Sequence, residues 1–573
     1  MEYKLIKGSA NDAYDILGTV LKNRGIENPD DYITINADVC PSWESLDNIG
    51  TAVDCFEEHF ADNDDITILV DCDPDGYTSA AMLYLYIKRM NPNYPVHYMI
   101  HKNNKAHGLG KMHEGDFKIP KGTRLIVLPD SSSNDLKEMN ELMAKGIDII
   151  VLDHHEVEPS DIKCDAIIVN NQISSNYANK DFSGAGIVYE FLKGLDERFW
   201  NDYADDYLDL VALANISDLM DLKSLPTRYY VNLGLRSINN SMFKAFVQAQ
   251  EYSIKGAVTP TAVAWSITPI INAMVRVGSF EERDLLFKAF IEEYQEFDYK
   301  KRSGEIIKET IYERVARLCK NAKGRQDKQR DKLFQSLIKK VDVSDKVVIV
   351  EADDADSGIV GLVAMKLADY LKRCVVVLRD IGDDTLSGSL RNYDNSPVEN
   401  LKELLNDTNL FHCQGHSNAA GAEIQRNDLS TAKNLLNGTL KDVVFDSTYL
   451  CDFVLPVEYV DVRFVKEVDD CSWVWCTGIK EPNIAVTNIA IARKDIRVQG
   501  KELNSIMFEL DGIKYVAFKL QEDHPLLAFA NGWGDREDVI VFDAVVTCGI
   551  NVYEGVSQCQ CTIKDVVLTQ QSD

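Results

Sequence analysis

Residues 1–60 are predicted to be helical, and from there to residue 222 short apolar runs alternate with helically spaced stretches. Apolar side chains recur at helical spacing over 76–90, and a serine-capped helix is predicted to follow at 131–146. Near-continuous apolar runs, which predict strands, occupy 66–71, 95–101, 124–130, 147–155 and 166–170. Buried strands separated by helices predict a parallel sheet of the α/β class, with helices covering its faces.

The alternation stops after residue 222 and returns after residue 340. The interval is helix-rich, and the second α/β pattern is followed by strands with Gly and Asn turns, as in a small β-barrel. We therefore predict an α/β fold in four parts: a helical leader with a parallel-sheet domain (1–222), a helical connector with a long basic helix (223–340), a smaller α/β domain (341–445) and a β-barrel (446–573).

The predicted strands of the first domain end in acidic residues or histidines. Three strand ends carry them, and a fourth candidate closes an apolar stretch: Asp71, Asp73 and Asp75; Asp130; Asp153, His154 and His155; and Asp218. Ligand sites in parallel sheets form at the carboxyl ends of the strands. One polar strand end arises readily by chance, whereas three on neighbouring strands indicate a shared site.

Carboxylates combined with a neutral imidazole favour Mn²⁺ or a similar divalent ion over structural zinc, which prefers thiolate-rich tetrahedra. Four negative charges and one imidazole are supplied by Asp73, Asp75, Asp130, His154 and Asp218. These charges balance two divalent ions, and such pairs activate water for displacement at phosphorus. The alternative is a series of helix caps and turn aspartates, which would suffice for a single Asp-x-Asp but explains the whole set poorly.

The distribution of charge bears on the partner. The chain has a net charge of −30, yet residues 300–340 contain 14 Lys or Arg and five Asp or Glu. A basic track on an acidic body suits contact with a nucleic-acid backbone, and a solvated helix face is the alternative.

Cysteine use and hydropathy bear on the compartment. The 13 cysteines are scattered without a CxxC pair, which fits neither a disulfide framework nor a zinc ribbon. No apolar run approaches the roughly 18 residues needed to span a bilayer, and the N-terminus lacks the apolar core of a signal peptide. We expect a cytoplasmic protein without a membrane partner.

Four short motifs in a fixed order resemble those of the DHH phosphoesterase superfamily. They read DCDPDG, LPD, DHH and ISD, and GSLR and GHSNAAG resemble the companion DHH-associated domain. The terminal strands resemble the OB-fold of RecJ-like single-stranded-DNA exonucleases, and the likeness extends over about residues 45–570. The resemblance implies 5′→3′ hydrolysis of single-stranded DNA in recombination, repair or replication. It also implies two Mn²⁺ ions, with Mg²⁺ as the alternative ion.

The resemblance implies roles for individual residues. The five residues that balance two ions would be the metal ligands, with Asp71 and Asp153 supporting them. His155 would contact the scissile phosphate or assist the leaving oxygen, and His416 would face the metals from the second α/β domain. The catalytic group would comprise His154, His155, Asp130 and His416. Substrate contacts, including a pocket for the 5′-phosphate, would come from Arg276, Ser389, Arg391, Lys102 and Gly415.

Three positions depart from the family pattern. The second motif reads PDSSSND where Asp-x-Gly is usual, and GGH has become Gln414-Gly415-His416. Lys102 stands where an arginine precedes a GYGL element, which reads HGLG here. Such divergence fits a phage or otherwise distant member, acting in a bacterial or phage-infected cell. Its partner would be single-stranded DNA, with a single-strand-binding protein or a helicase nearby.

Two other functions stay open. A phosphodiesterase of short oligonucleotides or cyclic dinucleotides would use the same motifs, but such relatives tend to lack the barrel and the long connector expected here. An inactive replication scaffold would have lost metal ligands, and all five ligand positions are intact. The barrel could also form a single-strand platform, for which Tyr553 and Trp533 are the stacking candidates.

Overall fold

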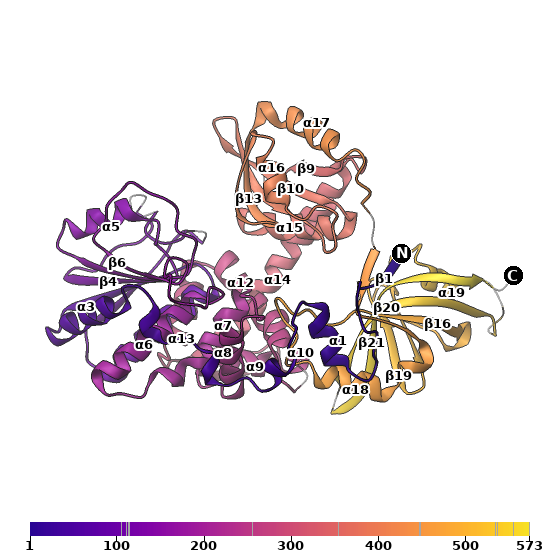
Figure 1. The fold of residues 1–573 in the computed structure, drawn as a ribbon, viewed down its shortest axis with the longest axis horizontal. Coiled ribbons are helices and arrows are strands. Elements are labelled where there is room, and N and C mark those ends of the chain that lie inside the picture. The colour runs from indigo at the N-terminus through magenta and orange to yellow at the C-terminus, as the bar shows by residue number, and fades with distance from the viewer. Residues whose placement is uncertain are drawn as a thin grey trace.

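The computed structural model describes the chain except for residues 105, 111, 113–114, 255, 353–354, 446–447, 533–534, 536, 554 and 572–573 and the side chains of 553, 570 and 571. Figure 1 shows a parallel-sheet domain on the left, a small α/β domain above and a strand-rich C-terminal domain on the right, with helices between them. This architecture confirms the predicted fold class.

A five-stranded parallel sheet with the order β3-β2-β4-β5-β6 forms the first domain. Its strands are β2 (Asp65–Val70), β3 (Val96–Ile100), β4 (Thr123–Pro129), β5 (Asp148–Asp153) and β6 (Ile167–Asn170). Each strand coincides with a predicted apolar run. Because β3 and β4 lie on opposite sides of β2, the strand order switches between β2 and β4, and such points form ligand crevices in α/β sheets.

Helices cover both faces of this sheet. On one face, Ile66, Ile68 and Val70 of β2 pack into a large buried cluster with four helices: α3 (Ile49–Ala61), α4 (Pro74–Met90), α6 (Gly184–Phe199) and α7 (Leu208–Ser217). On the other face, Leu69 joins a smaller cluster with α5 (Leu136–Met143). Alternate residues of the strand therefore point to opposite cores, which accounts for its continuous apolar sequence.

The connector is helical as predicted, except at the start of its basic segment. Its main elements are α8 (Leu225–Arg236), α9 (Ser241–Ala249), α12 (Thr268–Val277), α13 (Phe280–Phe290) and α14 (Ile311–Leu337). The strands β7 (Glu296–Lys300) and β8 (Ile306–Thr310) form a hairpin where the basic run begins. In the described part of the chain, no helix is both long and apolar enough to cross a membrane.

Several basic side chains of α14 are already paired with acids. Arg317 contacts Glu309 at 2.6 Å, Arg325 contacts Glu282 at 2.9 Å, and Arg330 contacts Asp327 at 2.8 Å. The charge available to an external anion is therefore smaller than the composition of residues 300–340 suggests.

The second α/β domain has a mixed sheet with the order β12-β13-β11-β10-β9. Its elements are β9 (Val347–Glu351), α15 (Ser357–Leu371), β10 (Cys374–Gly382), β11 (Thr385–Arg391), α16 (Leu401–Asn406), β12 (Phe411–His416), β13 (Ala419–Gln425) and α17 (Leu429–Thr439). Only β9 and β10 pair in parallel among these described strands, so the sheet is antiparallel where the predicted GSLR and GHSNAAG segments lie.

The C-terminal domain is one sheet with the order β15-β16-β20-β21-β19-β18-β17, as expected for an OB-like, strand-rich region. Its elements are β15 (Phe453–Pro456), α18 (Val462–Asp470), β16 (Ile484–Ala492), β17 (Arg497–Gln499), β18 (Ser505–Leu510), β19 (Ile513–Ala517), α19 (Pro525–Asn531), β20 (Val539–Tyr553) and β21 (Val556–Gln571). Trp533 and the side chain of Tyr553, the predicted stacking candidates, lie outside the described residues.

The start of the leader differs from the prediction, which joined it to the first domain and expected helix. The strand β1 (Glu2–Leu5) pairs in parallel with β14 (Thr448–Cys451), and α1 (Ile16–Asn23) packs into the C-terminal core. Arg24 contacts the buried carboxylate of Asp452 through two hydrogen bonds, at 2.7 and 3.0 Å. The range 1–222 therefore includes residues that pack in two places, because a local sequence pattern does not reveal a partner more than 400 residues away.

Candidate metal centre and phosphate clamp

Side chains from four segments converge at the carboxyl edge of the parallel sheet. Their ligand atoms form three overlapping groups, each within 4.8 Å: Asp71, Asp73 and Asp130; Asp75, His154 and Asp218; and Asp130, His154 and His155. The segments follow β2, β4 and β5 and the end of α7. The five predicted metal ligands therefore share one site, together with two further residues of the predicted constellation.

Asp75 is fixed by the first turn of α6. The backbone N–H groups of Gly184 and Ala185 donate to its two carboxylate oxygens at 2.7 and 2.8 Å. Asp75 is 1% exposed, and burial, together with the charge of Asp73, raises its pKa to about 7. The helix N-terminus orients this carboxylate but leaves further lone pairs on both oxygens.

Asp130 is held by its backbone. Its N–H donates to the carbonyl of Leu152 at 2.8 Å, and its φ of 60° places it in the left-handed region, which is unusual for aspartate. Gly184 makes this approach possible, because a Cβ there would lie 2.5 Å from the Asp130 Cβ. The side chain is buried, yet neither carboxylate oxygen has a hydrogen-bond partner among the described residues.

His154 presents its Nε2 atom to three of these carboxylates. It lies 3.2 Å from Asp130, 3.4 Å from Asp218 and 3.8 Å from Asp75. Burial, together with the neighbouring charge of His155, lowers the pKa of His154 to about 3, so the imidazole is neutral. Nε2 also has no hydrogen-bond partner in the described part of the chain, and a neutral imidazole nitrogen is a common metal ligand in proteins.

The remaining two carboxylates are also disfavoured as anions. Burial, followed by the charge of Asp71, raises the pKa of Asp73. Burial and the charges of Asp75 and Asp73 raise the pKa of Asp218 well above its ordinary value. A divalent cation among these groups would reverse that penalty, because an opposite charge stabilises the ionised form.

The residues present fit a divalent-metal centre. Asp130 and His154 contribute three buried polar atoms without protein partners among the described residues, and buried polar atoms are rarely left unpaired. The donor set of carboxylates and one neutral imidazole suits Mn²⁺ or Mg²⁺ rather than structural zinc. Asp73, Asp75, Asp130, His154 and Asp218 are therefore the residues that would hold the ions.

Asp153 and His155 form a hydrogen-bonded pair beside the cluster. The two are 2.8 Å apart through Nδ1, and the backbone of Ser133 also donates to Asp153. Burial opposes the charged imidazole, but the hydrogen bond and charge of Asp153 outweigh it and raise the pKa of His155 to about 10. His155 is half exposed and therefore offers a cationic N–H to a substrate anion.

The loop after β4 keeps a left-handed turn although serine replaces the usual glycine. Ser132 has a φ of 80°, and its Oγ accepts a hydrogen bond from the backbone of Leu109 at 3.2 Å. This contact offsets the strain that a side chain suffers in this region. Ser132 therefore adopts the backbone conformation that glycine favours, at the position where the pattern has glycine.

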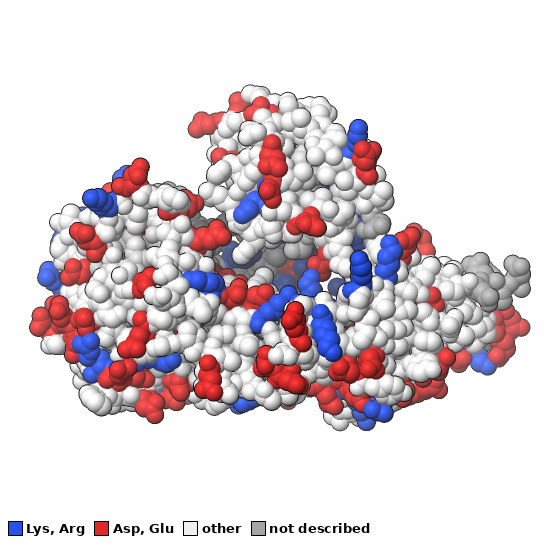
Figure 2. Space-filling view, in the orientation of Figure 1, with Lys and Arg blue, Asp and Glu red and all other residues white. Residues whose placement is uncertain are grey.

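The second α/β domain borders a hollow in the surface of the molecule (Figure 2). Figure 2 shows this hollow between the first, second and C-terminal domains, with Lys and Arg side chains gathered around it on an otherwise largely acidic face. His416 lies at the end of β12, and its charge helps to lower the pKa of His154. The position of His416 relative to the metals stays a prediction.

Arg276 of α12 and Arg391 of β11 both lie against α15. A Cβ at Gly358 would lie 3.7 Å from the Arg276 Cβ, and one at Gly361 would lie 2.7 Å from Nη2 of Arg391. Burial lowers the pKa of Arg391 to about 10, with the charge of Arg276 as the second cause. Burial also lowers the pKa of Arg276, while the charge of Asp73 opposes this shift. Ser389 lies two residues before Arg391 on β11, and both approach Gly361 of α15. We call Arg276, Ser389 and Arg391 the phosphate clamp, after the role that we propose for them.

The two remaining predicted substrate contacts are less well placed. The Lys102 ammonium donates to the carbonyl of Gly115 at 2.9 Å and so points along its own loop. Gly415 has a φ of 120°, a conformation that L residues rarely adopt, and its carbonyl accepts a hydrogen bond from Lys402 at 2.7 Å. Gly415 therefore shapes the strand that carries His416.

Comparisons with known proteins agree on the family. Residues 65–215 match the model described as the DHH family, N-terminal domain. YorK of Bacillus subtilis (strain 168) is 34% identical to this chain over 588 residues, and the match covers 100% of both chains. Its name describes it as an SPbeta prophage-derived single-strand DNA-specific exonuclease. RecJ of the same organism, named as a single-stranded-DNA-specific exonuclease, is 24% identical over 85% of this chain and 61% of its own length. The chain is a RecJ-like member of the DHH family.

Solved RecJ structures share the fold. The RecJ structure from Thermus thermophilus in complex with Mn²⁺ superposes with a TM-score of 0.70 at 18% identity, covering 100% of this chain and 79% of that chain. The Mg²⁺ complex of RecJ from the same organism gives 0.65 at 17% identity, covering 100% and 78%. For this RecJ-like chain, family membership and the carboxylate cluster together support a hydrolytic nuclease that depends on a divalent metal.

One residue beside the RecJ-like centre escaped the sequence analysis. His107 contacts Asp71 at 2.6 Å, although the sequence drew attention only to the HGLG element that it begins. Its position follows from the folding of a loop, which no periodic pattern predicts. The only available signal was the departure of this element from the usual GYGL.

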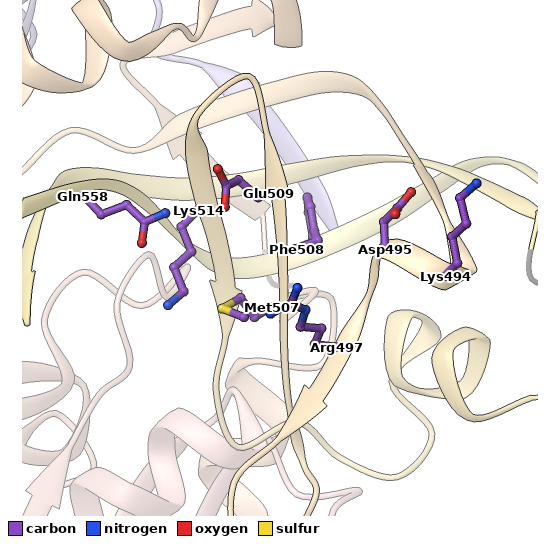
Figure 3. Close-up of a pocket in the computed structure, with 8 residues that line it drawn as sticks. All are labelled: Lys494, Asp495, Arg497, Met507, Phe508, Glu509, Lys514 and Gln558. Atoms are coloured by element: carbon purple, nitrogen blue, oxygen red, sulfur yellow. The ribbon is translucent and has the colours of Figure 1, made fainter.

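A pocket of about 370 Å³ lies on the C-terminal sheet (Figure 3). Lys494, Arg497 and Lys514 line it together with Asp495 and Glu509, so its charge is mixed. Its one aromatic side chain, that of Phe508, is buried and stacks on Tyr515 with ring centroids 5.1 Å apart. This face lacks the exposed aromatic side chains that a single-strand platform uses, as far as the described lining residues show.

Proposed function

We propose that the chain hydrolyses the phosphodiester bonds of single-stranded DNA from the 5′ end, with two divalent ions held by Asp73, Asp75, Asp130, His154 and Asp218. The observation that carries the proposal is the buried set of Asp130 and His154 atoms without partners among the described residues, surrounded by carboxylates whose pKa values are raised. The relatives' names as single-strand-specific exonucleases support the choice of substrate. Mn²⁺ is the ion that we propose first.

The polarity is proposed from the clamp. Arg276 and Arg391 both approach α15, at Gly358 and Gly361, and guanidinium groups bind phosphate through paired hydrogen bonds. A terminal 5′-phosphate carries more negative charge than an internal phosphodiester, so it is the better partner for two like charges. With the 5′ end in the clamp, an adjacent phosphodiester would lie at the carboxylates.

The remaining residues divide the chemistry among themselves. Bound divalent ions would supply a water-derived nucleophile at neutral pH and would neutralise charge on the phosphoryl oxygens. His155, oriented by Asp153, would donate to the scissile phosphate or to the leaving oxygen. His416 would close the site from the second domain, and Asp71 would orient the loop that carries Asp73.

The test compares substrates and ions. Purified protein receives 5′-phosphorylated and 5′-hydroxyl single strands labelled at the 3′ end, the matching duplex, and a dinucleotide, with Mn²⁺ or Mg²⁺. We expect mononucleotide release from single strands, fastest with a 5′-phosphate and Mn²⁺. Preference for the dinucleotide would replace the proposal by a small-molecule phosphodiesterase. Metal binding without any hydrolysis would indicate a scaffold.

An enzyme that acts on single-stranded DNA needs another protein to separate the strands or to keep them apart. We propose that a helicase or a single-strand-binding protein acts with the chain, and the mixed-charge pocket on the C-terminal sheet is a candidate contact. Exonuclease rates on strands coated with a single-strand-binding protein would test this. Inhibition equal to that of an unrelated nuclease would argue against a specific contact.

A further inference from the structure

Asp71 and His107 form a second carboxylate–imidazole pair at the rim of the centre. His107 Nδ1 lies 2.6 Å from Oδ2 of Asp71, and the backbone N–H of Gly108 donates to Oδ1 at 3.0 Å. Asp71 is fully buried, whereas the His107 side chain is 61% exposed. Both oxygens of Asp71 are thus engaged by one loop, and the free edge of the imidazole faces solvent.

This pair has the same design as Asp153 and His155. In both, a buried aspartate at a strand end holds Nδ1 of an exposed histidine, at 2.6 Å in one case and 2.8 Å in the other. In both, the carboxylate raises the pKa of the imidazole, to about 9 for His107 and about 10 for His155. The two aspartates lie at the carboxyl ends of β2 and β5, which flank β4 and its Asp130 in the sheet, whereas His107 itself lies between β3 and β4.

The carboxylate that holds His107 belongs to the candidate metal centre. One ligand atom of Asp71 lies within 4.8 Å of ligand atoms of Asp73 and Asp130, so the bond to Asp71 places the His107 ring beside this group. The loop is fixed on both sides of the ring. Leu109 donates to Asp135 at 2.7 Å, and Asn103 donates to Asp116, which in turn contacts the buried His101 at 2.5 Å. His107 is therefore held in place rather than carried by a loose loop.

We propose that His107 is a second imidazole contact to the substrate, donating a hydrogen bond from Nε2 to a non-bridging oxygen of the phosphodiester opposite His155. The inference rests on the proposed nuclease function and names a catalytic residue for it. Asp71 would act as the positioning residue for His107. Two imidazole donors on opposite sides of a phosphoryl group would stabilise its charge in addition to the metal ions.

The test distinguishes the contributions of the two ring nitrogens of His107, Nδ1 and Nε2. In His107→Asn the side-chain amide can replace Nδ1 and keep the bond to Asp71, whereas in His107→Gln it can reach the position of Nε2. We expect kcat/KM on single-stranded DNA to fall about 10- to 100-fold in His107→Asn, the range for a hydrogen bond to a charged group. His107→Gln should recover part of that loss. Mn²⁺ affinity, measured by calorimetry, should stay within about twofold of wild type in both variants, because neither change touches a predicted metal ligand.

A matched control comes from the other end of the same sheet. His97 on β3 is a partly exposed imidazole, 3.6 Å from Asp65, and His97→Asn should leave kcat/KM unchanged. Wild-type-like rates in His107→Asn would overturn the inference, as would a loss that follows weakened Mn²⁺ binding. Failure of the wild type to cut single strands would refute the proposed function itself, which keeps the two outcomes distinct.

Discussion

The metal-ligand cluster and the phosphate clamp concentrate opposite charges by different means. The cluster gathers carboxylates at one edge of one sheet, and helix caps and backbone amides fix them within a single domain. The clamp joins Arg276 of α12 to Ser389 and Arg391 of β11, so it depends on the packing of the second α/β domain against the connector. In the proposed function, the ability to cut would therefore be built locally, whereas the recognition of an end would depend on how two parts of the chain meet.

Each region contains like charges that a substrate complex would neutralise. In the cluster, burial and neighbouring carboxylates raise the pKa of Asp130 well above its ordinary value. In the clamp, burial and a neighbouring guanidinium lower the pKa of Arg391. A phosphorylated strand with divalent ions satisfies both at once, since the ions meet the carboxylates and the phosphate meets the arginines.

The largest expected effect comes from Asp130→Asn. Partners that only orient metal ligands typically contribute about 10- to 100-fold to activity, so loss of a ligand should lower kcat by more than about 100-fold. The same change removes a buried like charge and should raise the melting temperature of the metal-free protein. Activity assays and thermal melts with and without EDTA measure both effects.

Asp65→Asn is the control for this change, because Asp65 begins β2 at the opposite end of the sheet. Its activity should match that of the wild type. An Asp130→Asn protein that remained fully active would contradict the assignment of the cluster.

The cluster could be predicted from the sequence for a physical reason. Asp73, Asp130 and His154 each follow an apolar strand, and parallel strands bring their carboxyl ends to one edge. The supporting role of Asp71 came only from the family resemblance and stays a prediction, because Asp71 is engaged by a loop yet also groups with Asp73 and Asp130. What the sequence could not provide was the contact of α6 with Asp75, because Gly184 lies more than 100 residues further along the chain.

Gly184→Ala tests that contact with the second-largest expected effect. The new methyl group would lie 2.5 Å from the Asp130 Cβ and 2.7 Å from its Cα, so either α6 or the strand end must shift. Displacements of about 1 Å can cost about 100-fold in rate, and overpacking typically costs about 1–3 kcal/mol of stability. Steady-state kinetics and chemical denaturation should show both losses.

The comparison variant is Gly324→Ala in α14, where a Cβ would meet nothing within 4 Å. Alanine is the better helix former there and should stabilise the protein by up to about 1 kcal/mol, with unchanged kinetics. Equal effects of the two substitutions would show that the approach of α6 to Asp130 has no special importance.

Arg391→Lys probes the clamp and should have a smaller effect, because the positive charge remains. Lysine cannot make the paired hydrogen bonds of a guanidinium, so KM for a 5′-phosphorylated strand should rise about tenfold, while kcat changes little. The difference between 5′-phosphorylated and 5′-hydroxyl substrates should shrink. An equal rise in KM for both substrates would remove the clamp from end recognition.

The sequence predicted the clamp only through family resemblance. There is a physical reason why the sequence pattern alone could not predict it. Arg276 and Arg391 are separated by more than 100 residues, and no periodicity links a connector helix to a strand of another domain. The same limit explains the misplaced leader, whose β1 pairs with a strand far along the chain. It also explains why the pairing of arginines on α14 with nearby acids could not be predicted from composition.

The smallest expected effect concerns that helix and decides whether the clamp extends along it. Lys328 is exposed and has no ion pair within the described part of the structure, whereas Arg330 contacts Asp327 and Asp331, each at 2.8 Å. If α14 follows the DNA backbone, Lys328→Gln should reduce the slope of log affinity against log salt by about 0.7, the value for one phosphate contact on a single strand. Arg330→Gln should change it less, since neighbouring acids already balance that charge. Fluorescence anisotropy of a labelled strand at several salt concentrations measures the slope. Equal slopes for wild type and Lys328→Gln would show that Lys328 does not contact a DNA phosphate. Phosphate recognition would then be limited to the clamp, and α14 would serve only to connect two domains.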